Sequence, residues 1–170
     1  MANLPPFPVT QLHQVGIVVR DLERAMRDYW ERFGIGPWRV YTYGPPLVKE
    51  MTYRGRRQDY RMRLAFTWVG SLMVELIQSL EGPNIYEEFL QERGEGLHHV
   101  LMYVDDLDAA IRDLEARGYP MIQSGRGYGV HGDGGYAYFD TVAQLGTILE
   151  VAQVPKERVA PDALYPAPEG

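Results

Sequence analysis

The sequence predicts an α+β fold built from two tandem copies of one β-α-β-β-β module. Two observations lead to this class. An internal repeat relates residues 14–32 to residues 99–117, and in both copies a helix-like segment is followed by several strand-like runs. The chain of 170 residues, 45% of them hydrophobic, is also long enough to bury a core of its own.

The repeat has a constant offset of 85 residues, at which QVGIVVRDLERAMRDYWER lies opposite HVLMYVDDLDAAIRDLEAR. Average residue usage would give about one identity over such a stretch. The identities are Val15/Val100, Val19/Val104, Asp21/Asp106, Leu22/Leu107, Ala25/Ala110, Arg27/Arg112, Asp28/Asp113 and Arg32/Arg117. We therefore interpret the two segments as the products of a duplication.

Each copy begins with a β-branched strand, over residues 15–19 and 100–104, and continues with an aspartate. Asp21 and Asp106 stand where a side-chain oxygen can cap the free N–H groups of a helix. The apolar residues behind them follow helical spacing: Leu22, Ala25, Met26, Tyr29 and Phe33 in the first copy, and Leu107, Ala110, Ile111 and Leu114 in the second. A glycine after each segment marks its end.

Strand-like runs complete the two modules. They cover residues 38–43, 47–53, 60–69 and 72–80 in the first half, and 119–124, 135–140 and 147–154 in the second. Between the halves, Asn84 as a cap and Glu87 three residues later predict a short linking helix. The expected organisation is a first module over 12–80, a linking helix over 83–94, a second module over 95–154 and a C-terminal tail over 155–170. We expect this tail, with its four prolines, to be loosely ordered.

Composition excludes several classes of function. The net charge of −6 is spread along the chain without a basic block, so we expect no nucleic-acid partner. No apolar run reaches the roughly 18 residues of a membrane span, and the N-terminus lacks a secretion signal, so we expect a soluble, cytoplasmic protein without a membrane partner. Because the chain has no cysteine, a metal site must use oxygen or imidazole ligands.

Two carboxylates lie inside apolar strands at equivalent places in the two halves. Glu75 stands within LMVELI and Glu150 within ILEVA. A carboxylate is costly to bury unless a cation or hydrogen bonds compensate it, and here the cost recurs in both copies. Exposure of both residues to solvent would also explain the pattern, but a shared buried site is the interpretation that uses the repeat.

The repeat also places Gln14 opposite His99, each just before the predicted first strand of its copy. If the copies pack about a pseudo-twofold axis, Gln14, Glu75, His99 and Glu150 can converge on one point. Three oxygen ligands and one imidazole suit a divalent ion such as Mn, Co, Ni or Zn, with positions left open for water or substrate. The sequence therefore predicts one metal site shared by the two modules.

The repeat and its flanking motifs resemble the vicinal-oxygen-chelate superfamily, which includes glyoxalases, bleomycin-resistance proteins and extradiol dioxygenases. The similarity runs from about residue 12 to residue 154 and rests on QVGIVVRDL from Gln14 and GLHHVLMYVDDL from Gly96. It implies a cupped, mixed or antiparallel sheet with helices on the outside. It also implies one metal ligand on the first and last strand of each module, at Gln14, Glu75, His99 and Glu150.

The segment EFLQERGEGLHHV, from Glu88, is similar to methylmalonyl-CoA epimerases in particular. Two departures from that pattern matter. Those epimerases usually carry histidine where this chain has Gln14, and a set of Gln, Glu, His and Glu instead resembles glyoxalase I. The additional catalytic glutamate of the epimerases has no clean match in LVKEMTYRGRRQDYRMR, where Glu50 is the candidate.

The expected reaction is proton removal from a carbon next to a carbonyl, with the metal stabilising the enolate. Glu75 and Glu150 are the expected catalytic residues, because carboxylates on opposite sides of a planar enolate could take a proton from one face and return one to the other. The expected partner is a small carbonyl or thioester substrate, an acyl-CoA among those considered, and the expected assembly is a homodimer. The alternatives are a lactoylglutathione lyase-type glyoxalase, a ring-cleaving dioxygenase and a metal-free small-molecule binding or resistance protein.

Several other polar residues are weaker candidates. His13 and His98 precede the predicted ligands, so strand alternation predicts that they point to the opposite face and pack there. His131 lies in a glycine-rich loop that could fold over a pocket. The arginines between Arg54 and Arg63 could hold an anionic substrate, although alternating arginines also describe a solvated strand face. The tyrosines of the first half could line an aromatic pocket.

Overall fold

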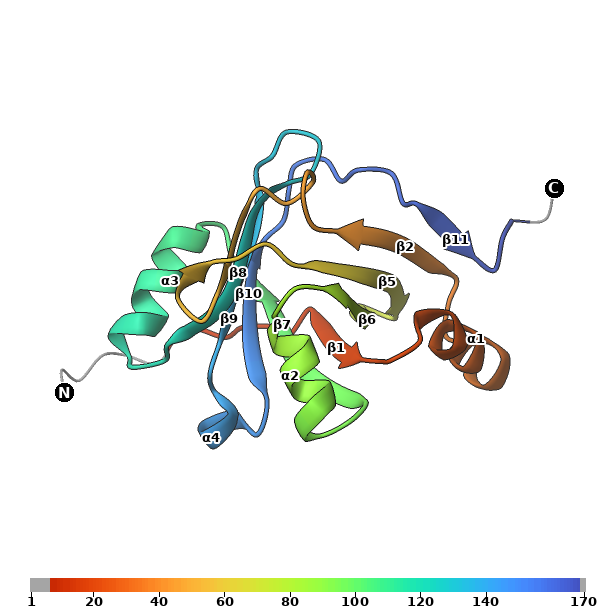
Figure 1. The fold of residues 1–170 in the computed structure, drawn as a ribbon, viewed down its shortest axis with the longest axis horizontal. Coiled ribbons are helices and arrows are strands. Elements are labelled where there is room, and N and C mark those ends of the chain that lie inside the picture. Colours follow the sequence, from red (N-terminus) through yellow and green to blue (C-terminus); the bar gives the residue numbers. More distant parts are fainter. Residues whose placement is uncertain (1–6, 169–170) are drawn as a thin grey trace.

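The computed structural model describes residues 7–168, whose strands join into one eleven-stranded sheet that curves into a cup (Figure 1). The strands are β1 (Gln14–Val18), β2 (Trp38–Tyr43), β3 (Glu50–Tyr53), β4 (Arg56–Arg57), β5 (Arg61–Val69), β6 (Leu72–Glu81), β7 (Gly96–Tyr103), β8 (Met121–Tyr128), β9 (Gly134–Phe139), β10 (Ile148–Gln153) and β11 (Ala163–Tyr165). The helices are α1 (Leu22–Phe33), α2 (Ile85–Glu92), α3 (Leu107–Ala116) and α4 (Val142–Leu145).

The two halves of the chain meet at the middle of the sheet. Its order is β11-β2-β5-β6-β1-β7-β10-β9-β8-β3-β4, so the first strands of the two halves are neighbours. β1 and β7 pair antiparallel, whereas β1 is parallel to β6 and β7 is parallel to β10. The mixed sheet and its outer helices confirm the predicted α+β class and the cupped shape.

The predicted helix starts are present. The side chain of Asp21 accepts a hydrogen bond from the Arg24 N–H, that of Asp106 from the Ala109 N–H, and Asn84 caps α2. α1 and α3 lie on the outer side of the cup, at its right and left in Figure 1, and each buries its apolar stripe against one half of the sheet. The sequence periodicity thus predicted the buried helix faces except at Phe33, which is 73% exposed at the end of α1.

The inner side of the cup holds a separate core of large apolar side chains. It includes tyrosines from both halves of the sheet: Tyr41, Tyr43, Tyr60, Tyr128, Tyr136 and Tyr138. Ile85, Tyr86 and Leu90 of α2 pack into the same cluster, so the linking helix closes one end of the cup. The concave face is therefore a packed chamber in which any polar group needs a partner.

Three parts of the fold differ from the prediction. The run at 47–53 does not join the sheet of the first half, because β3 pairs with β8 of the second half and carries β4 with it. The tail is not loosely ordered throughout, since β11 pairs with β2. The short helix α4 was not predicted. Each feature depends on contacts between distant segments, which local sequence patterns do not contain. The module boundaries expected from the sequence stay a prediction.

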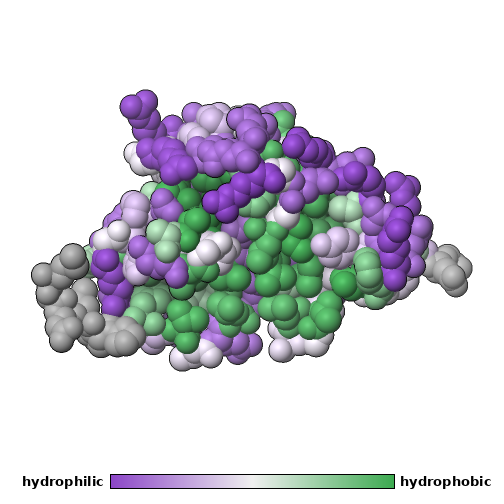
Figure 2. Space-filling model, turned by 90° about the horizontal axis from the view of Figure 1, so that it is seen from below, coloured by the Kyte–Doolittle hydropathy of each residue, from purple (hydrophilic) through white to green (hydrophobic). Residues whose placement is uncertain are grey.

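The face seen from below in Figure 2 carries apolar side chains over its centre. Exposed apolar residues include Leu97 of β7 and Leu145 of α4, and α4 lies at the lower edge of Figure 1. Among the helices of residues 7–168, none combines the length and the apolar content that crossing a membrane requires.

Candidate metal centre

Strand register brings the four predicted ligands together. Gly16 of β1 lies opposite both Glu75 of β6 and His99 of β7. One row further along the cup, Leu101 of β7 lies opposite both Gln14 of β1 and Glu150 of β10. The two glutamates thus come from symmetric strands on either side of the central β1–β7 pair. Their side chains enter the cup from opposite sides.

The four side chains are almost fully buried, with at most 5% of their surface exposed. His99 Nε2 lies 3.2 Å from Glu75 Oε2 and 3.0 Å from Glu150 Oε2. Gln14 Nε2 donates a hydrogen bond of 2.6 Å to Glu75 Oε2 and lies 3.3 Å from His99 Nε2. The structure therefore brings together every residue that the sequence predicted for this site.

These donor atoms fit a cation. Ligand atoms of Glu75, His99 and Glu150 all lie within 4.8 Å of one another. Glu150 Oε2 is buried and accepts no hydrogen bond among the described residues, although His99 Nε2 is close. Two carboxylate oxygens and an imidazole nitrogen that face each other in a buried space repel unless a proton or a metal ion lies between them. Oxygen and imidazole donors suit a divalent ion of borderline hardness.

Gln14 contributes in a different way from the other three residues. Its amide nitrogen faces Glu75 and His99, so in this arrangement Gln14 is a hydrogen-bond donor. To act as a ligand, the amide would have to rotate and present its Oε1. Gln14 therefore orients the carboxylate of Glu75 in the structure described here.

Burial controls the protonation of the site. It raises the pKa of Glu75 to about 7, against the opposing effect of His99. Burial by itself lowers the pKa of His99, but the nearby carboxylates of Glu150 and Glu75 outweigh it and raise that pKa to about 9. A metal ion that binds here must displace these protons.

Gly16 makes the room that the His99 ring occupies. A Cβ at this position would lie 1.9 Å from His99 Cε1 and 2.1 Å from its Nε2. The repeat aligns Gly16 with Leu101, which shows that the two halves differ at this inner position. The missing side chain is therefore a structural requirement of the site, and sequence reasoning did not assign it.

His98 does not lie on the opposite face of the strand, as alternation predicted. The register shifts between Gly16 and Ile17 because His98 is an unpaired bulge residue, and its Nδ1 lies 3.0 Å from His99 Nδ1. Burial lowers the pKa of His98 and keeps its ring neutral. With His99 Nε2 facing the carboxylates, the Nδ1–H of His99 can donate to His98 Nδ1, which fixes the orientation of the His99 ring.

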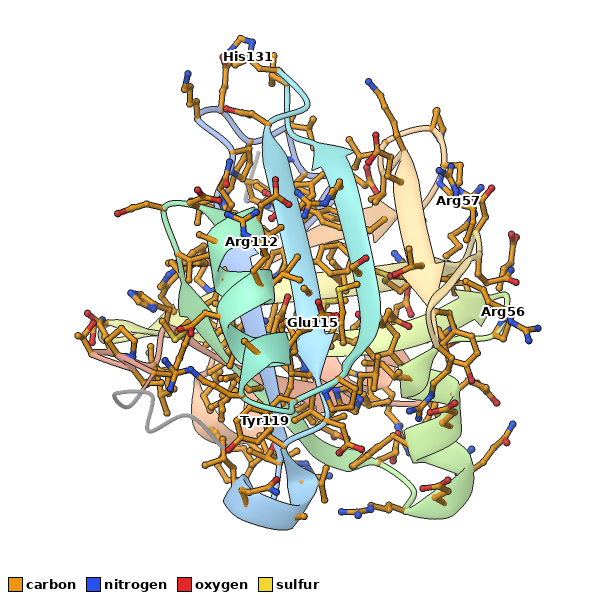
Figure 3. All side chains as sticks on the ribbon, turned by 90° about the vertical axis from the view of Figure 1, so that its left-hand side faces the viewer. Arg56, Arg57, Arg112, Glu115, Tyr119 and His131 are labelled. Carbon is orange, nitrogen blue, oxygen red and sulfur yellow. The ribbon has the colours of Figure 1, made fainter. Side chains whose placement is uncertain are left out.

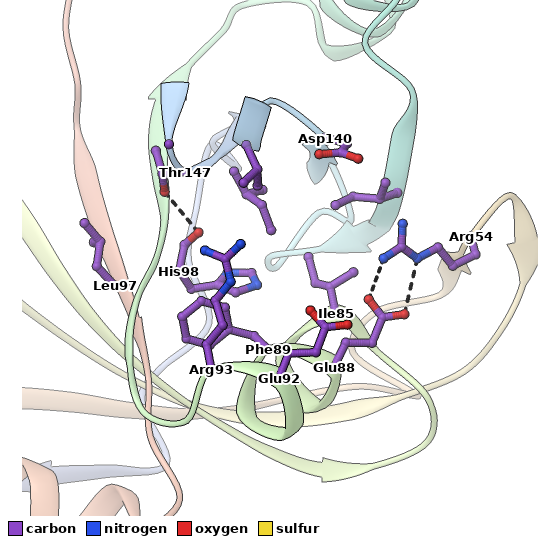
Figure 4. A pocket seen from close by; sticks show the side chains of 14 residues that line it. Arg54, Ile85, Glu88, Phe89, Glu92, Arg93, Leu97, His98, Asp140 and Thr147 are labelled. Carbon is purple, nitrogen blue, oxygen red and sulfur yellow. Dashed lines mark hydrogen bonds and ion pairs between the residues drawn. The ribbon is translucent and has the colours of Figure 1, made fainter. Parts of the chain in front are cut away.

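A cavity of about 240 Å³ lies behind His98, between α2 and the start of β10 (Figure 4). The Arg54–Glu88 ion pair forms one side of it, and Phe89, Arg93 and Thr147 lie around the His98 ring. The Nε2 atom of His98 has no hydrogen-bond partner among the described residues. This cavity is separate from the inner one that contains the candidate metal centre.

The inner cavity has a volume of only about 40 Å³. Its polar centre is formed by Gln14, Glu75 and Glu150, and Arg158 of the tail also lines it. Its wall is aromatic and includes Tyr43, Tyr86, Tyr103, Tyr128, Tyr136 and Tyr138. A space of this size holds a few waters or an ion and little more.

The weaker candidates lie away from this centre. Glu50 is exposed on β3, opposite Arg126. His131 lies at the tip of the β8–β9 loop, where it pairs with Glu157 (Figure 3). His13 packs on Tyr103 and accepts a hydrogen bond from its N–H, as a packing role predicts.

The arginines between Arg54 and Arg63 also lie away from this centre. Arg56 and Arg57 project outward at the edge of the sheet (Figure 3), while Arg54, Arg61 and Arg63 pair with the carboxylates of Glu88, Glu81 and Glu23. None of these arginines lines the inner cavity. The solvated strand face is thus the interpretation that the structure supports, and Arg158 is the arginine that reaches the site.

Comparisons with known proteins agree with this geometry. The family model described as the Glyoxalase/Bleomycin resistance protein/Dioxygenase superfamily matches residues 13–139. The mitochondrial methylmalonyl-CoA epimerase of Mus musculus is 26% identical over 129 residues, which are 75% of this chain and 65% of that protein. The Homo sapiens enzyme is 26% identical over 123 residues, 72% of this chain and 62% of that protein. The match thus spans just under two thirds of these relatives.

Solved structures share the fold. A methylmalonyl-CoA epimerase from Mycobacterium tuberculosis superposes with a TM-score of 0.58 at 23% identity and covers 91% of this chain and 95% of its own. A hypothetical protein from Bacillus halodurans C-125 gives a TM-score of 0.60 at 20% identity, over 88% of this chain and 97% of its own. At these identities the likeness establishes the architecture of the cup.

We predict that Gly16→Ala weakens metal binding. The new methyl group must push the His99 ring out of its place, and changes to groups that orient metal ligands cost about 10- to 100-fold in affinity. Titration with Co²⁺, followed by calorimetry, measures the effect. Val15→Ala is the control, because it removes apolar packing from the other face of the same strand. Equal affinities of Gly16→Ala and the parent protein would contradict this role of Gly16.

We also predict that metal affinity rises with pH between about 6 and 9. The raised pKa values of Glu75 and His99 mean that both groups keep their protons to higher pH, and a bound ion must displace them. Each displaced proton changes the apparent affinity by at most about tenfold per pH unit. Calorimetry in two buffers of different ionisation enthalpy counts the protons released. Affinity that stays constant over this range would show that the free site is already deprotonated.

Proposed function

The chain belongs to the Glyoxalase/Bleomycin resistance protein/Dioxygenase superfamily, and we propose that it is a divalent-metal-dependent epimerase or racemase of carbon acids. One observation carries the proposal: two buried carboxylates, Glu75 and Glu150, enter the cup from opposite sides and face the same imidazole nitrogen of His99. The relatives named methylmalonyl-CoA epimerase support this choice, and an acyl-CoA thioester is the substrate that their names suggest.

We assign Glu75, His99 and Glu150 as the residues that would hold the metal, with Gln14 beside them as a ligand or as the donor that orients Glu75. The ion would be Mn, Co, Ni or Zn, since the donors are oxygen and imidazole. When bound, it would supply a Lewis acid that polarises the carbonyl next to the acidic carbon.

The residues of the chain divide the proton transfer between them. A carboxylate oxygen of one glutamate takes the proton from the substrate carbon, and the carboxyl group of the other returns a proton to the opposite face. Burial raises the pKa of Glu75, which makes its carboxylate a stronger base than an exposed one. The tyrosine-lined wall keeps bulk water away from the reacting carbon.

Glu50 does not supply the additional glutamate that the epimerase resemblance implies. It is exposed on β3 and lies outside the inner cavity. In this proposal Glu75 and Glu150 therefore act as the two bases. This chain thus differs from the epimerases that it resembles, which use an additional catalytic glutamate.

A glyoxalase of the lactoylglutathione lyase type is the second candidate. The observation in its favour is Gln14, which occupies the position where the epimerase pattern has histidine and lies in the centre of the site. The reaction would use the same two carboxylates to move a proton between neighbouring carbons. Turnover of the hemithioacetal of methylglyoxal and glutathione, and none of a chiral acyl-CoA, would select it.

Two further alternatives fit the site less well. A ring-cleaving dioxygenase needs two histidines and one carboxylate on its iron, whereas His98 here faces the other nitrogen of His99 instead of the centre. A metal-free binding protein would not need buried carboxylates that face each other. Metal analysis of protein purified without chelators separates this last class: less than a few tenths of an equivalent, with no gain on titration, would overturn the proposal.

The expected homodimer stays a prediction, for which the apolar face in Figure 2 is the candidate surface. The mass in solution, measured by light scattering, tests it.

We predict that metal-loaded protein incorporates solvent deuterium at the α-carbon of (2R)- or (2S)-methylmalonyl-CoA while its configuration inverts. Glu75→Gln and Glu150→Gln should each lower this exchange about 100-fold or more, because general acid–base groups contribute roughly that factor. Proton NMR in heavy water measures exchange and configuration together. Metal content is measured in parallel, since both residues are also assigned as ligands.

The matched control is Glu115→Gln, on the outer helix α3 (Figure 3), which should leave exchange unchanged. Inversion without deuterium incorporation would exclude proton transfer through these carboxylates. Full activity of either cup variant would remove that glutamate from the mechanism.

A further inference from the structure

The tail crosses the open side of the cup as a strap, which we define as residues 155–165. Figure 1 shows it running from the end of β10 over the top of the molecule to β11, beside β2. At its first end, the carbonyl of Glu157 accepts a hydrogen bond of 2.9 Å from the Val130 N–H. At its other end, the Asp162 N–H donates 2.8 Å to the carbonyl of Val40. The strap thus ties the second half of the sheet to the first.

Between these anchors the strap turns two side chains inward. Val159 packs against the inner core, and Arg158 lines the same cavity as Gln14, Glu75 and Glu150. The guanidinium of Arg158 forms a hydrogen bond with the Tyr103 hydroxyl. Burial raises the pKa of Tyr103, and the charge of Arg158 opposes this rise. It also opposes the rise of the Glu75 pKa, so its charge reaches the centre of the site.

Within the described part of the chain, no carboxylate forms an ion pair with Arg158. Among residues 7–168, ion pairs within 4.0 Å engage eight other arginines, which are Arg24, Arg32, Arg54, Arg57, Arg61, Arg63, Arg117 and Arg126. Arg158 is not in an ion pair of this kind, although it is half-buried over the cavity. A guanidinium held at a site by a neutral hydroxyl is available to an incoming anion.

We propose that Arg158 is a specificity-determining residue, which binds a carboxylate that the substrate carries next to its acidic carbon. The planar guanidinium can hold a carboxylate through two parallel hydrogen bonds, which fixes both its position and its rotation. Anchored in this way, the neighbouring carbon is presented to Glu75 and Glu150 below. The inference rests on the proposed proton transfer and assigns to Arg158 the selection of 2-carboxyacyl substrates over carbonyl compounds that lack this carboxylate.

The inner cavity is too small for the proposed substrate. About 40 Å³ cannot hold a carboxylate together with the carbon and carbonyl beside it. The strap is fixed to the sheet by few hydrogen bonds and carries Arg158 itself. A substrate of this size therefore needs part of the cavity wall to move, and Arg158 of the strap belongs to that wall.

The test compares two small thioesters of N-acetylcysteamine in heavy water: methylmalonyl, which carries a free carboxylate, and its methyl ester, which does not. Arg158→Met keeps the length of the side chain and removes its charge. It should raise KM for the acid about 10- to 100-fold, the range of a charge-assisted hydrogen-bonded pair, and leave exchange of the ester unchanged. Arg158→Lys should restore part of the loss, because it keeps the charge without the planar fork.

Arg112→Met, on the outer face of α3 (Figure 3), is the matched control and should behave as the parent protein with both thioesters. Equal losses on the acid and the ester would show that Arg158 only supports the fold of the site, and unchanged KM for the acid would show that it does not bind the carboxylate. Either result overturns the proposal.

A binding measurement separates this proposal from the proposed function. Calorimetry of metal-loaded protein with methylmalonate should show affinity about tenfold or more weaker in Arg158→Met than in Arg112→Met. If the parent protein exchanges neither thioester, the proposed reaction fails, and the methylmalonate affinities still decide whether Arg158 binds a carboxylate. Equal affinities of the two variants would overturn it.

Discussion

The fold depends on one electrostatic constraint, which is the burial of Glu75 and Glu150 around His99. Two carboxylates inside an apolar cup are unfavourable by several kcal/mol each unless a cation or protons lie between them. Three nearby features serve this arrangement: the Gln14 amide donates to Glu75, Gly16 leaves space for the imidazole, and His98 Nδ1 lies within hydrogen-bond distance of the far nitrogen of that ring. The site is therefore built to hold positive charge, whatever reaction uses it.

Duplication explains how such a site can be assembled from two copies of a module. The antiparallel β1–β7 pair relates corresponding residues of the two copies by a pseudo-twofold axis. One carboxylate in each copy therefore gives two carboxylates that enter the cup from opposite sides. The copies then differ where the chemistry needs it. Gly16 in one copy corresponds to Leu101 in the other, and only the glycine side can accept the His99 ring. The symmetry supplies the two carboxylates, and its local loss supplies the imidazole.

The repeat made the site predictable from sequence, because equal spacing within each copy carries Glu75 and Glu150 to equivalent strands. The helix caps at Asp21 and Asp106 were predictable for a local reason, since a cap depends on its own helix alone. His98 was not predictable, because a bulge arises from the register between β1 and β7 and interrupts the alternation on which the prediction depended. Arg158 carried no local signal at all. Its role comes from the path of the strap across the cup, which is set by contacts far away in the chain.

Charge balance links the strap to the choice between the candidate reactions. A divalent ion with two carboxylates and a neutral imidazole is close to neutral, and Arg158 then adds one positive charge to a half-buried site. A substrate with a carboxylate near its reacting carbon would compensate the positive charge of Arg158. A substrate without a carboxylate next to its reacting carbon, such as the hemithioacetal of a glyoxalase, leaves the guanidinium uncompensated, and a charge without a partner in an apolar cavity is unfavourable. The arginine over the cup therefore favours the epimerase of 2-carboxyacyl substrates over the glyoxalase, even though Gln14 by itself points the other way.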